Sequence, residues 1–258
     1  MQYNPDHLAI KPVLKQADKA MLVDMAAAYP LIKFRSEVRN YEELMVDFVY
    51  TSAKIEGNTY DRVDTDNLLR LGITAGGKKH SDAIMLVNLR VGFDHVMQAD
   101  RKNALDLNYV GSLHGVLMRD LLPVHEQGLV RQSSVLIGAT TYRPLADADR
   151  LSTEMRFLLA SAEKIEDGFE RAIYLHCNLA YLQYFRDGNK RTARLVQTAC
   201  LVQHDLLPLF FADSLIDVYR RATVHYYETG DYAPYVDFFK ANYRLVVNSL
   251  SGISFSEA

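Results

Sequence analysis

Hydrophobic and polar positions alternate with the spacing of helices over most of this chain. Apolar residues recur every three or four positions, which places them on one face of a helix. Pro30 ends the first such stretch, and Gly57 and Gly72 follow others at positions typical of helix C-caps. The pattern predicts helices at 14–32, 36–57, 61–72, 81–97 and 104–122, and again from 147 past 243.

The segment between Pro123 and Pro144 breaks the helical pattern. Its sequence "SSVLIGATTYRPL" holds two short apolar runs around Gly138, which predicts a small β-hairpin near 134–142. One hairpin among many helices indicates an all-α fold and not an α/β nucleotide-binding sheet.

The order of the elements suggests three divisions of the chain. We expect a helical N-terminal extension at 1–60, a core domain at 61–245 and a frayed tail at 246–258. Repeats, low-complexity tracts and Ser/Gly linkers are absent from the sequence, so nothing in its composition points to a flexible connection between domains.

Composition narrows the class of protein without naming a function. With 258 residues, 49% of them hydrophobic and 24% charged, the chain has the profile of a soluble globular protein. A net charge of −3 gives no indication of nucleic-acid or membrane partners. The start "MQYNPDHLAIKP" lacks a signal-peptide pattern, and no run of about 18 apolar residues occurs, so we expect a cytoplasmic location.

The two cysteines, Cys177 and Cys200, lie in apolar, helix-like surroundings. We expect both to be buried free thiols rather than a disulfide pair. They cannot build a metal cluster between them.

The stretch "LQYFRDGNKRTAR", residues 182–194, carries the densest chemistry in the chain. It connects two apolar helices, so free backbone N–H groups and the positive end of a helix dipole meet there. Gly188 allows a tight turn. Lys190, Arg191 and Arg194 oppose the dipole unless an anion binds beside them, which favours a phosphate group.

Asp187 adds a carboxylate next to this anion site. A carboxylate beside phosphates is a natural ligand for Mg²⁺, so the local chemistry indicates a nucleotide with a divalent cation. The alternative is an ordinary surface loop with salt bridges and a glycine turn. The P-loop pattern G-x-x-x-x-G-K is absent.

Residues 183–194, Q-Y-F-R-D-G-N-K-R-T-A-R, resemble the signature of the Fic family, H-x-F-x-(D/E)-G-N-(G/K)-R-x-x-R. Every defined position matches except the first. The likeness extends over about 40–245. A second stretch, "SAKIEGN" at 52–58, resembles the inhibitory motif (S/T)-x-x-x-E-(G/N) of the subgroup whose inhibitory helix precedes the core, here at about 45–57.

The resemblance implies an activity, cofactors and partners. Fic proteins mostly transfer AMP from ATP to a Ser, Thr or Tyr hydroxyl of a target protein, with Mg²⁺. Some members move other phosphate-containing groups, some remove AMP, and some subgroups form dimers. The implied function is therefore protein adenylyltransferase, with ATP as substrate or ligand and a homodimer left open.

The resemblance also implies a role for each matching residue. Glu56, one helical turn after Ser52 on the same face, would pair with Arg194 and block the productive pose of the γ-phosphate. The other implied roles are loop anchor for Phe185, Mg²⁺ ligand for Asp187, phosphate cradle for Gly188, Asn189 and Lys190, and grip on the outer phosphates for Arg191 and Arg194.

Gln183 stands where the family has the His that takes the proton from the target hydroxyl. An amide is no base near pH 7, and losing a positioned base lowers a rate about 10²–10⁴-fold. We interpret His114 and His176 as structural, so neither replaces it. Gln183 and Tyr184 are adjacent departures, more typical of natural divergence than of one engineered change. Two alternatives follow: an inactive nucleotide-binding regulatory module, or an AMP-removing hydrolase in which Glu56 activates water.

Two further regions complete the predicted site. Val135, Leu136, Ile137 and Tyr142 belong to the predicted hairpin, which could act as a flap that pairs with an extended target segment. The alternative is a hairpin that only packs on the core. Tyr219 is a candidate to stack on adenine, although a structural role is as plausible among 16 tyrosines.

Overall fold

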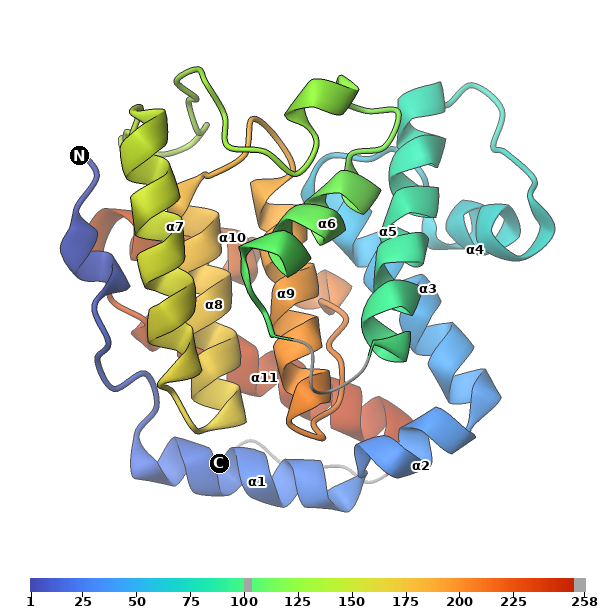
Figure 1. Ribbon diagram of the computed structural model, residues 1–258. Helices are drawn as coiled ribbons and strands as arrows, with labels where there is room; N and C mark the ends of the chain where they lie inside the picture. Colours follow the sequence, from blue (N-terminus) through green and yellow to red (C-terminus); the bar gives the residue numbers. More distant parts are fainter. Residues whose placement is uncertain (100–103, 253–258) are drawn as a thin grey trace.

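The computed structural model describes residues 1–99 and 104–252, and this part of the chain is built from helices (Figure 1). The described residues contain no β-strand, so the predicted all-α class is confirmed. The α-helices are α1 (Gln16–Ala28), α2 (Leu31–Ser36), α3 (Val38–Ile55), α4 (Arg62–Leu71), α5 (His80–Gln98), α6 (Leu107–Leu117), α7 (Ala148–Glu163), α8 (Gly168–Leu182), α9 (Asn189–Gln203), α10 (Ile216–Thr229) and α11 (Ala233–Ser251). Three short 3₁₀ helices, η1 (Pro5–Leu8), η2 (Val124–Glu126) and η3 (Asp213–Leu215), lie between them.

Local capping chemistry sets several helix ends where the sequence predicts them. Asp61 accepts a hydrogen bond from the backbone N–H of Asp64 to begin α4, and Gly72 ends it in the left-handed conformation at φ 71°. Pro30 divides the first predicted helix into α1 and α2. Helix α9 begins at Asn189, with the left-handed Gly188 as its N-cap.

Helices α8 and α9 form the centre of the molecule (Figure 1). Helices α5 and α6 pack against α9, whereas α7, α10 and α11 pack against α8. Almost every residue of α8 and α9 is buried in one continuous hydrophobic core. The loop between these two helices is therefore held at both ends by closely packed elements.

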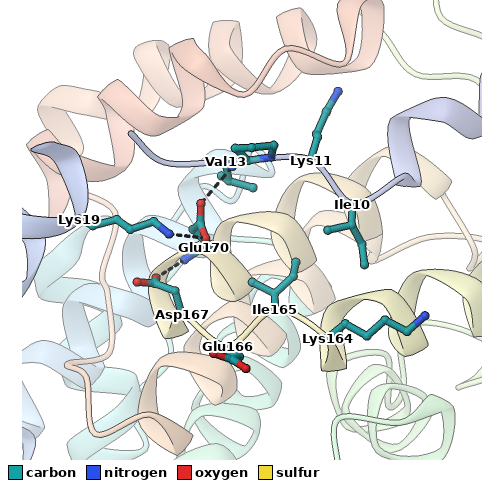
Figure 2. Close-up of a pocket in the computed structure, with 10 residues that line it drawn as sticks. Ile10, Lys11, Val13, Lys19, Lys164, Ile165, Glu166, Asp167 and Glu170 are labelled. Carbon is teal, nitrogen blue, oxygen red and sulfur yellow. Dashed lines mark hydrogen bonds and ion pairs between the residues drawn. The ribbon is translucent and has the colours of Figure 1, made fainter. Parts of the chain in front are cut away.

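The N-terminal extension packs on the core. Helix α3 lies against α5, and α1 lies along α11. The extended segment 9–15 runs past the start of α8, where Glu170 accepts hydrogen bonds from the backbone N–H groups of Val13 (3.1 Å) and Leu14 (2.9 Å) and pairs with Lys19 at 2.7 Å (Figure 2). The boundary expected between 1–60 and 61–245 stays a prediction.

The C-terminal region is helical further than the expected tail. Helix α11 continues through 246 to Ser251 and ends at the left-handed Gly252. The remainder of the predicted tail, 253–258, lies outside the described residues.

The predicted hairpin at 134–142 is not confirmed. A turn forms at Gly138 and Ala139, but the flanking segments do not pair with one another. An isolated two-stranded hairpin is marginal without a sheet or helix to support it. The segment is instead fixed by Tyr142, whose ring stacks on Tyr181 at 4.5 Å, and Arg143 forms a single parallel bridge with Gln2.

Two other expectations concern cysteines and membranes. Cys177 and Cys200 are free and buried, as predicted. In the described ranges, none of the helices has the length and apolar character needed to cross a membrane.

Candidate functional site

The loop from Gln183 to Gly188 joins α8 to α9 through two left-handed residues. Gln183 has φ 51° and Gly188 has φ 73°. Between them, the Phe185 ring stacks on the His114 ring of α6 at 3.8 Å, which fixes the loop in the core as the implied anchor role requires. The positive φ of Gly188 favours glycine, and a Cβ atom there would lie 2.6 Å from the sulfur of Met118, whose side chain would have to shift.

Asn189 braces the loop from inside. Its Oδ1 accepts a hydrogen bond from the backbone N–H of Phe185 at 2.9 Å, and its Nδ2 donates to the Phe185 carbonyl at 2.8 Å. The same Nδ2 group lies 3.2 Å from Oε1 of Gln183. The side chain implied to cradle phosphates is thus turned toward its own loop, and its contribution to a ligand would come from its backbone.

Gln183, at the position of the signature histidine, has both ends of its amide occupied. Its Oε1 accepts from Asn189 and its Nε2 donates to the carbonyl of Ala180 at 2.8 Å. The side chain is 9% exposed at the edge of the cavity described below. Chemically, it offers one acceptor edge for a hydroxyl and no base.

The two nearby histidines, His114 and His176, are buried and have structural contacts. Nδ1 of His114 accepts from the backbone N–H of Gly128 at 2.7 Å, so the proton is on Nε2, which donates to the Asp187 carbonyl at 3.0 Å. Burial lowers the pKa of His114 to about 4. Burial and the Arg194 charge lower the pKa of His176, whose Nε2 lies 3.3 Å from the Tyr219 hydroxyl. This geometry agrees with the structural interpretation of both residues.

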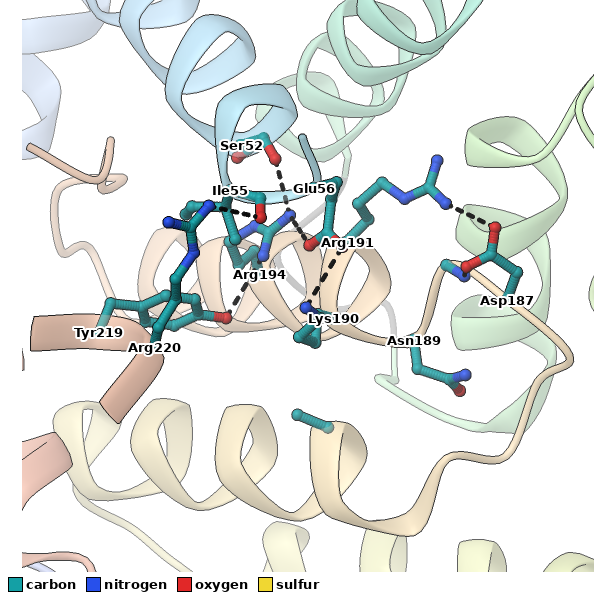
Figure 3. A network of polar contacts seen from close by, with 12 residues as sticks. Ser52, Ile55, Glu56, Asp187, Asn189, Lys190, Arg191, Arg194, Tyr219 and Arg220 are labelled. Atoms are coloured by element: carbon teal, nitrogen blue, oxygen red, sulfur yellow. Dashed lines mark hydrogen bonds and ion pairs between the residues drawn. The ribbon is translucent and has the colours of Figure 1, made fainter. Parts of the chain in front are cut away.

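Glu56 reaches across from the end of α3 to the cations of α9 (Figure 3). Its Oε1 lies 2.9 Å from Nη2 of Arg194, and its Oε2 lies 3.3 Å from Nζ of Lys190. The same Nη2 donates to the Ser52 carbonyl at 3.0 Å. Burial alone would raise the pKa of Glu56, but the charges of Arg194, Lys190 and Arg191 outweigh it and lower the pKa to about 2.

Several guanidinium donors in this cluster have no acceptor among the described residues. Arg191 is 4% exposed and pairs with Asp187 through Nη2 at 3.0 Å, but its Nε and Nη1 are buried without partners. Nε of the fully buried Arg194 also lacks a hydrogen-bond partner. Because buried donors are almost always satisfied, these groups fit a site that accepts an anion.

A cavity of about 240 Å³ opens beside this cluster. It is smaller than the roughly 300–1,000 Å³ of ordinary small-molecule pockets, so it has room for phosphate groups rather than a whole nucleotide. Its walls come from three separate parts of the chain: Glu56, then Val135, Leu136, Ile137 and Gly138, and then Gln183 and Arg186 to Lys190. The structure thus brings together the predicted inhibitory residue, the predicted flap and the loop.

Asp187 is the residue in this cavity that suits a divalent cation. Its side chain is 63% exposed, one oxygen accepts from the Gly188 N–H at 2.6 Å, and the other faces Arg191. The described residues hold no group of three or more His, Cys, Asp or Glu side chains placed to bind a metal ion. Mg²⁺ commonly uses one or two carboxylates together with substrate phosphates, so a single exposed aspartate fits it.

Tyr219 does not lie where adenine could stack on it. The residue is 1% exposed, and its ring is packed against Phe211 at 5.0 Å and His176 at 5.6 Å. Its hydroxyl accepts from Nη1 of Arg194 at 3.3 Å. The inward face of α10 buries Tyr219 beside Arg194, so its hydroxyl supports the arginine and its ring is not open to adenine.

The flap residues divide between surface and core. Leu136 is 76% exposed and lines the cavity with Val135 and Ile137. Tyr142 is fully buried and donates its hydroxyl to the Tyr181 carbonyl at 3.0 Å. It therefore holds the segment in place and takes no part in the cavity wall.

The sequence analysis assigned no role at the site to two arginines that the structure places near it. Arg131 is buried, donates from Nε to the Gln183 carbonyl at 2.7 Å, and also binds the carbonyls of Ser133 and Leu145. Arg220 on α10 binds backbone carbonyls at the end of α3. Arg220, and Arg131 in its bond to Gln183, act on backbone atoms far away in sequence, so a local pattern does not reveal these contacts.

A larger cavity of about 660 Å³ lies elsewhere, between the segment 10–13 and the start of α8 (Figure 2). Its wall carries Lys11, Lys19 and Lys164 together with acidic residues, and it shares no residue with the cavity at the loop. Its charges are of both signs, and Lys19 pairs with Glu170, so the cavity favours neither an anion nor a cation.

Residues 104–201 match the sequence profile of the Fic/DOC family. In this segment the chain is similar to the Fic/DOC family. The matched Fic/DOC segment contains α6, the flap segment, α7, α8 and nearly all of α9, and therefore the whole stretch 183–194. Glu56 on α3 and Arg220 on α10 lie outside it.

Individual relatives agree with the Fic/DOC match. The chain is 24% identical over 236 residues to protein adenylyltransferase fic-1 of Caenorhabditis briggsae, covering 88% of this chain and 46% of that protein. It therefore spans less than half the length of this curated relative.

Two solved structures show the same fold. A Fic family protein from Desulfovibrio desulfuricans G20 superposes with a TM-score of 0.80 at 20% identity, covering 94% of this chain and 77% of that one. A fragment of Fic-1 from C. elegans gives a TM-score of 0.73 at 20% identity, covering 92% and 72%. These likenesses establish an all-α Fic-type fold.

Proposed function

We propose that this chain binds the phosphates of ATP at the start of α9 and is a Fic-type AMP-transfer domain held inactive by Glu56. The contact of the Glu56 carboxylate with Arg194 and Lys190 carries the proposal. A carboxylate on a buried arginine occupies the donors that a phosphate would use. The relatives' description as protein adenylyltransferases supports AMP transfer.

The phosphate site would form when Glu56 moves away from Arg194. Phosphate oxygens would then accept from Arg194, from the unpartnered Nε and Nη1 of Arg191 and from the free N–H groups at the start of α9. Asp187 would hold Mg²⁺, which neutralises phosphate charge during group transfer. Each of these interactions stabilises negative charge where a phosphoryl group would react.

Gln183 limits what the site can do to a target hydroxyl. Its amide could position the hydroxyl by a hydrogen bond, but it removes no proton, so we expect transfer slower by about 10²–10⁴-fold than with a histidine. The target segment would lie along Val135, Leu136 and Ile137, pairing with a flap that has no strand partner among the described residues.

The second candidate is a nucleotide-binding module without transferase activity. The two hydrogen bonds of the Gln183 amide favour it, because they hold that side chain within the loop. Removal of AMP with Glu56 as base is less well supported. A carboxylate with a pKa of about 2, paired with two cations, is a weak base.

Transfer of label from α-³²P-ATP to protein tests the proposal. The variants are wild type, Glu56→Gly, Gln183→His and the double variant, with Glu56→Gln as the matched control that removes the charge and keeps the size. We expect strong labelling only in the double variant and weak labelling in Glu56→Gly. Equal labelling in Glu56→Gly and the double variant would show that Gln183 supports transfer, and no labelling with intact ATP binding would favour the binding module.

Calorimetry with ATP and Mg²⁺ tests the binding site itself. We expect Glu56→Gly to bind ATP more tightly than wild type, and Arg194→Ala in the same background to lose that gain. The absence of binding by folded Glu56→Gly would refute the nucleotide site.

A further inference from the structure

The last turn of α3, which presents Glu56, is held by two arginines from different helices (Figure 3). Arg194 of α9, which is fully buried, donates from Nη2 to the Ser52 carbonyl at 3.0 Å. Arg220 of α10 approaches from outside, and its Nη2 lies 3.0 Å from the Ile55 carbonyl and 3.3 Å from the Lys54 carbonyl. Glu56 is the next residue of the chain.

The carbonyls that Arg220 reaches are among the four that a helix leaves unpaired at its C-terminus. The backbone N–H groups of Glu56 and Asn58 both return to the Ala53 carbonyl, and that of Gly57 returns to Lys54. The Ile55 carbonyl accepts a hydrogen bond from Arg220. A cation at this end also interacts favourably with the negative pole of the helix dipole.

Arg220 itself is held in place and is not part of the cavity. Its Nη1 lies 3.2 Å from Oδ1 of Asp217 one turn earlier on α10, and its side chain is 47% exposed. The cavity at the loop does not include Arg220 in its lining. The residue can therefore affect Glu56 only through the position of the α3 end.

We propose that Arg220 is a positioning residue for inhibition: by capping the Ile55 and Lys54 carbonyls it holds Glu56 against Arg194, and its release favours the nucleotide-binding state. This inference rests on the proposed function for the direction of its effect on ATP. Loss of one hydrogen bond of ordinary net strength changes the balance between held and released states about fivefold.

A double-mutant cycle with Glu56 separates this role from a merely structural one. ATP affinity is measured by calorimetry for Arg220→Ala, Glu56→Gly and the double variant. We expect Arg220→Ala to tighten ATP binding about fivefold over wild type and to have no effect in the Glu56→Gly background. Arg220→Lys, which keeps a cationic donor, should lie between wild type and Arg220→Ala, and the neighbouring Arg221→Ala should match wild type.

Hydrogen exchange gives a readout that does not depend on ATP. The amides of Glu56, Gly57 and Asn58 should exchange about fivefold faster in Arg220→Ala than in wild type or Arg221→Ala. Equal effects of Arg220→Ala on ATP binding in both backgrounds, or unchanged exchange of these amides, would overturn the inference. If Glu56→Gly binds no ATP, the proposed function fails, while faster exchange in Arg220→Ala would still support Arg220 as the clamp on the α3 end.

Discussion

At the scale of single residues, the site contains two kinds of polar side chain. Some have all their hydrogen bonds within the loop, and others have donors without an acceptor. The side-chain amides of Asn189 and Gln183 form hydrogen bonds within the loop, whereas Arg191 has two buried donors without an acceptor. Buried amides whose hydrogen bonds are all made hold the loop in one geometry. Buried cationic donors that lack an acceptor give the site an affinity for anions. Asn189 and Gln183 therefore stabilise the loop, and Arg191 is available to bind a ligand.

Asn189→Ala should destabilise the protein by about 1–3 kcal/mol, because the backbone N–H and carbonyl of Phe185 would both lose a buried partner. Urea denaturation measures the change. Lys190→Ala is the control next to it; it removes an ion pair with Glu56 on a partly exposed side chain and should cost less than about 1 kcal/mol. Equal losses for the two variants would contradict the bracing role of Asn189.

His176 makes stability depend on pH. Burial lowers its pKa, so it stays neutral in the folded protein, whereas the unfolded chain binds a proton below the usual value of 6.5. Its contribution to stability is therefore complete above pH 6.5 and is lost as pH falls below it, by up to about 1.4 kcal/mol per pH unit. His176→Phe should reduce the slope of unfolding free energy between pH 6.5 and 5.

Denaturant unfolding at several pH values measures that slope. Tyr235→Phe is the matched control, since it removes a buried hydroxyl beside the same ring, where the two rings stack at 4.8 Å. It should lower stability without changing the slope. A slope in His176→Phe equal to that of wild type would contradict the assignment.

At the scale of elements, the loop depends on how closely α6 approaches the start of α9. His114 stacks on Phe185 from this helix, and Met118, which follows the last residue of α6, lies over Gly188. The conformation of the loop therefore depends on its packing against α6 as well as on α8 and α9, which it connects.

Gly188→Ala should destabilise the protein by about 1–3 kcal/mol and weaken ATP binding. The alanine would be strained at φ 73°, and its Cβ would lie 2.6 Å from the Met118 sulfur. Thermal unfolding and calorimetry measure the two effects. Met118→Ala removes the contact but leaves the backbone strain. Gly188→Ala should therefore cost less stability in a Met118→Ala background than in wild type, but the cost should not disappear.

At the scale of the whole molecule, segments far apart in sequence meet around α8 and α9. The N-terminal segment is fastened to α8 by Glu170, and Gln2 bridges to Arg143 at the base of the flap segment. Tyrosine hydroxyls support the same attachment, since Tyr174 binds the Leu8 carbonyl. The described part of the chain therefore behaves as one packed body around the candidate site.

Glu170→Ala should loosen the N-terminal segment. The backbone N–H groups of Val13 and Leu14 and the ammonium of Lys19 would lose their acceptor, at a cost of about 1–3 kcal/mol. Thermal unfolding and limited proteolysis within 9–15 measure the change. The exposed Glu166→Ala is the control, and cleavage at equal rates in the two variants would contradict the clamp.

The sequence by itself determined the helical class, the ends of α3, α4 and α5 to within two residues, and the stretch 183–194. These features depend on local rules: the spacing of apolar positions, Asp and Gly at caps, and a glycine turn before a basic helix start. For the same reason it located Asp187, Arg191 and Arg194 as a group. The hairpin predicted at 134–142 is not confirmed, since two apolar runs around a glycine form stable strands only when another element supports them.

Only the tertiary structure decided how these groups act on one another. Glu56 is 138 residues from Arg194 in sequence, and their 2.9 Å contact exists because α3 packs against α5 and α10. The burial of Tyr219, the commitment of His114 and the hold of Arg220 on α3 depend on the same packing. Contacts between distant segments arise from the burial of shared apolar surface, and a local pattern carries no record of which faces will meet.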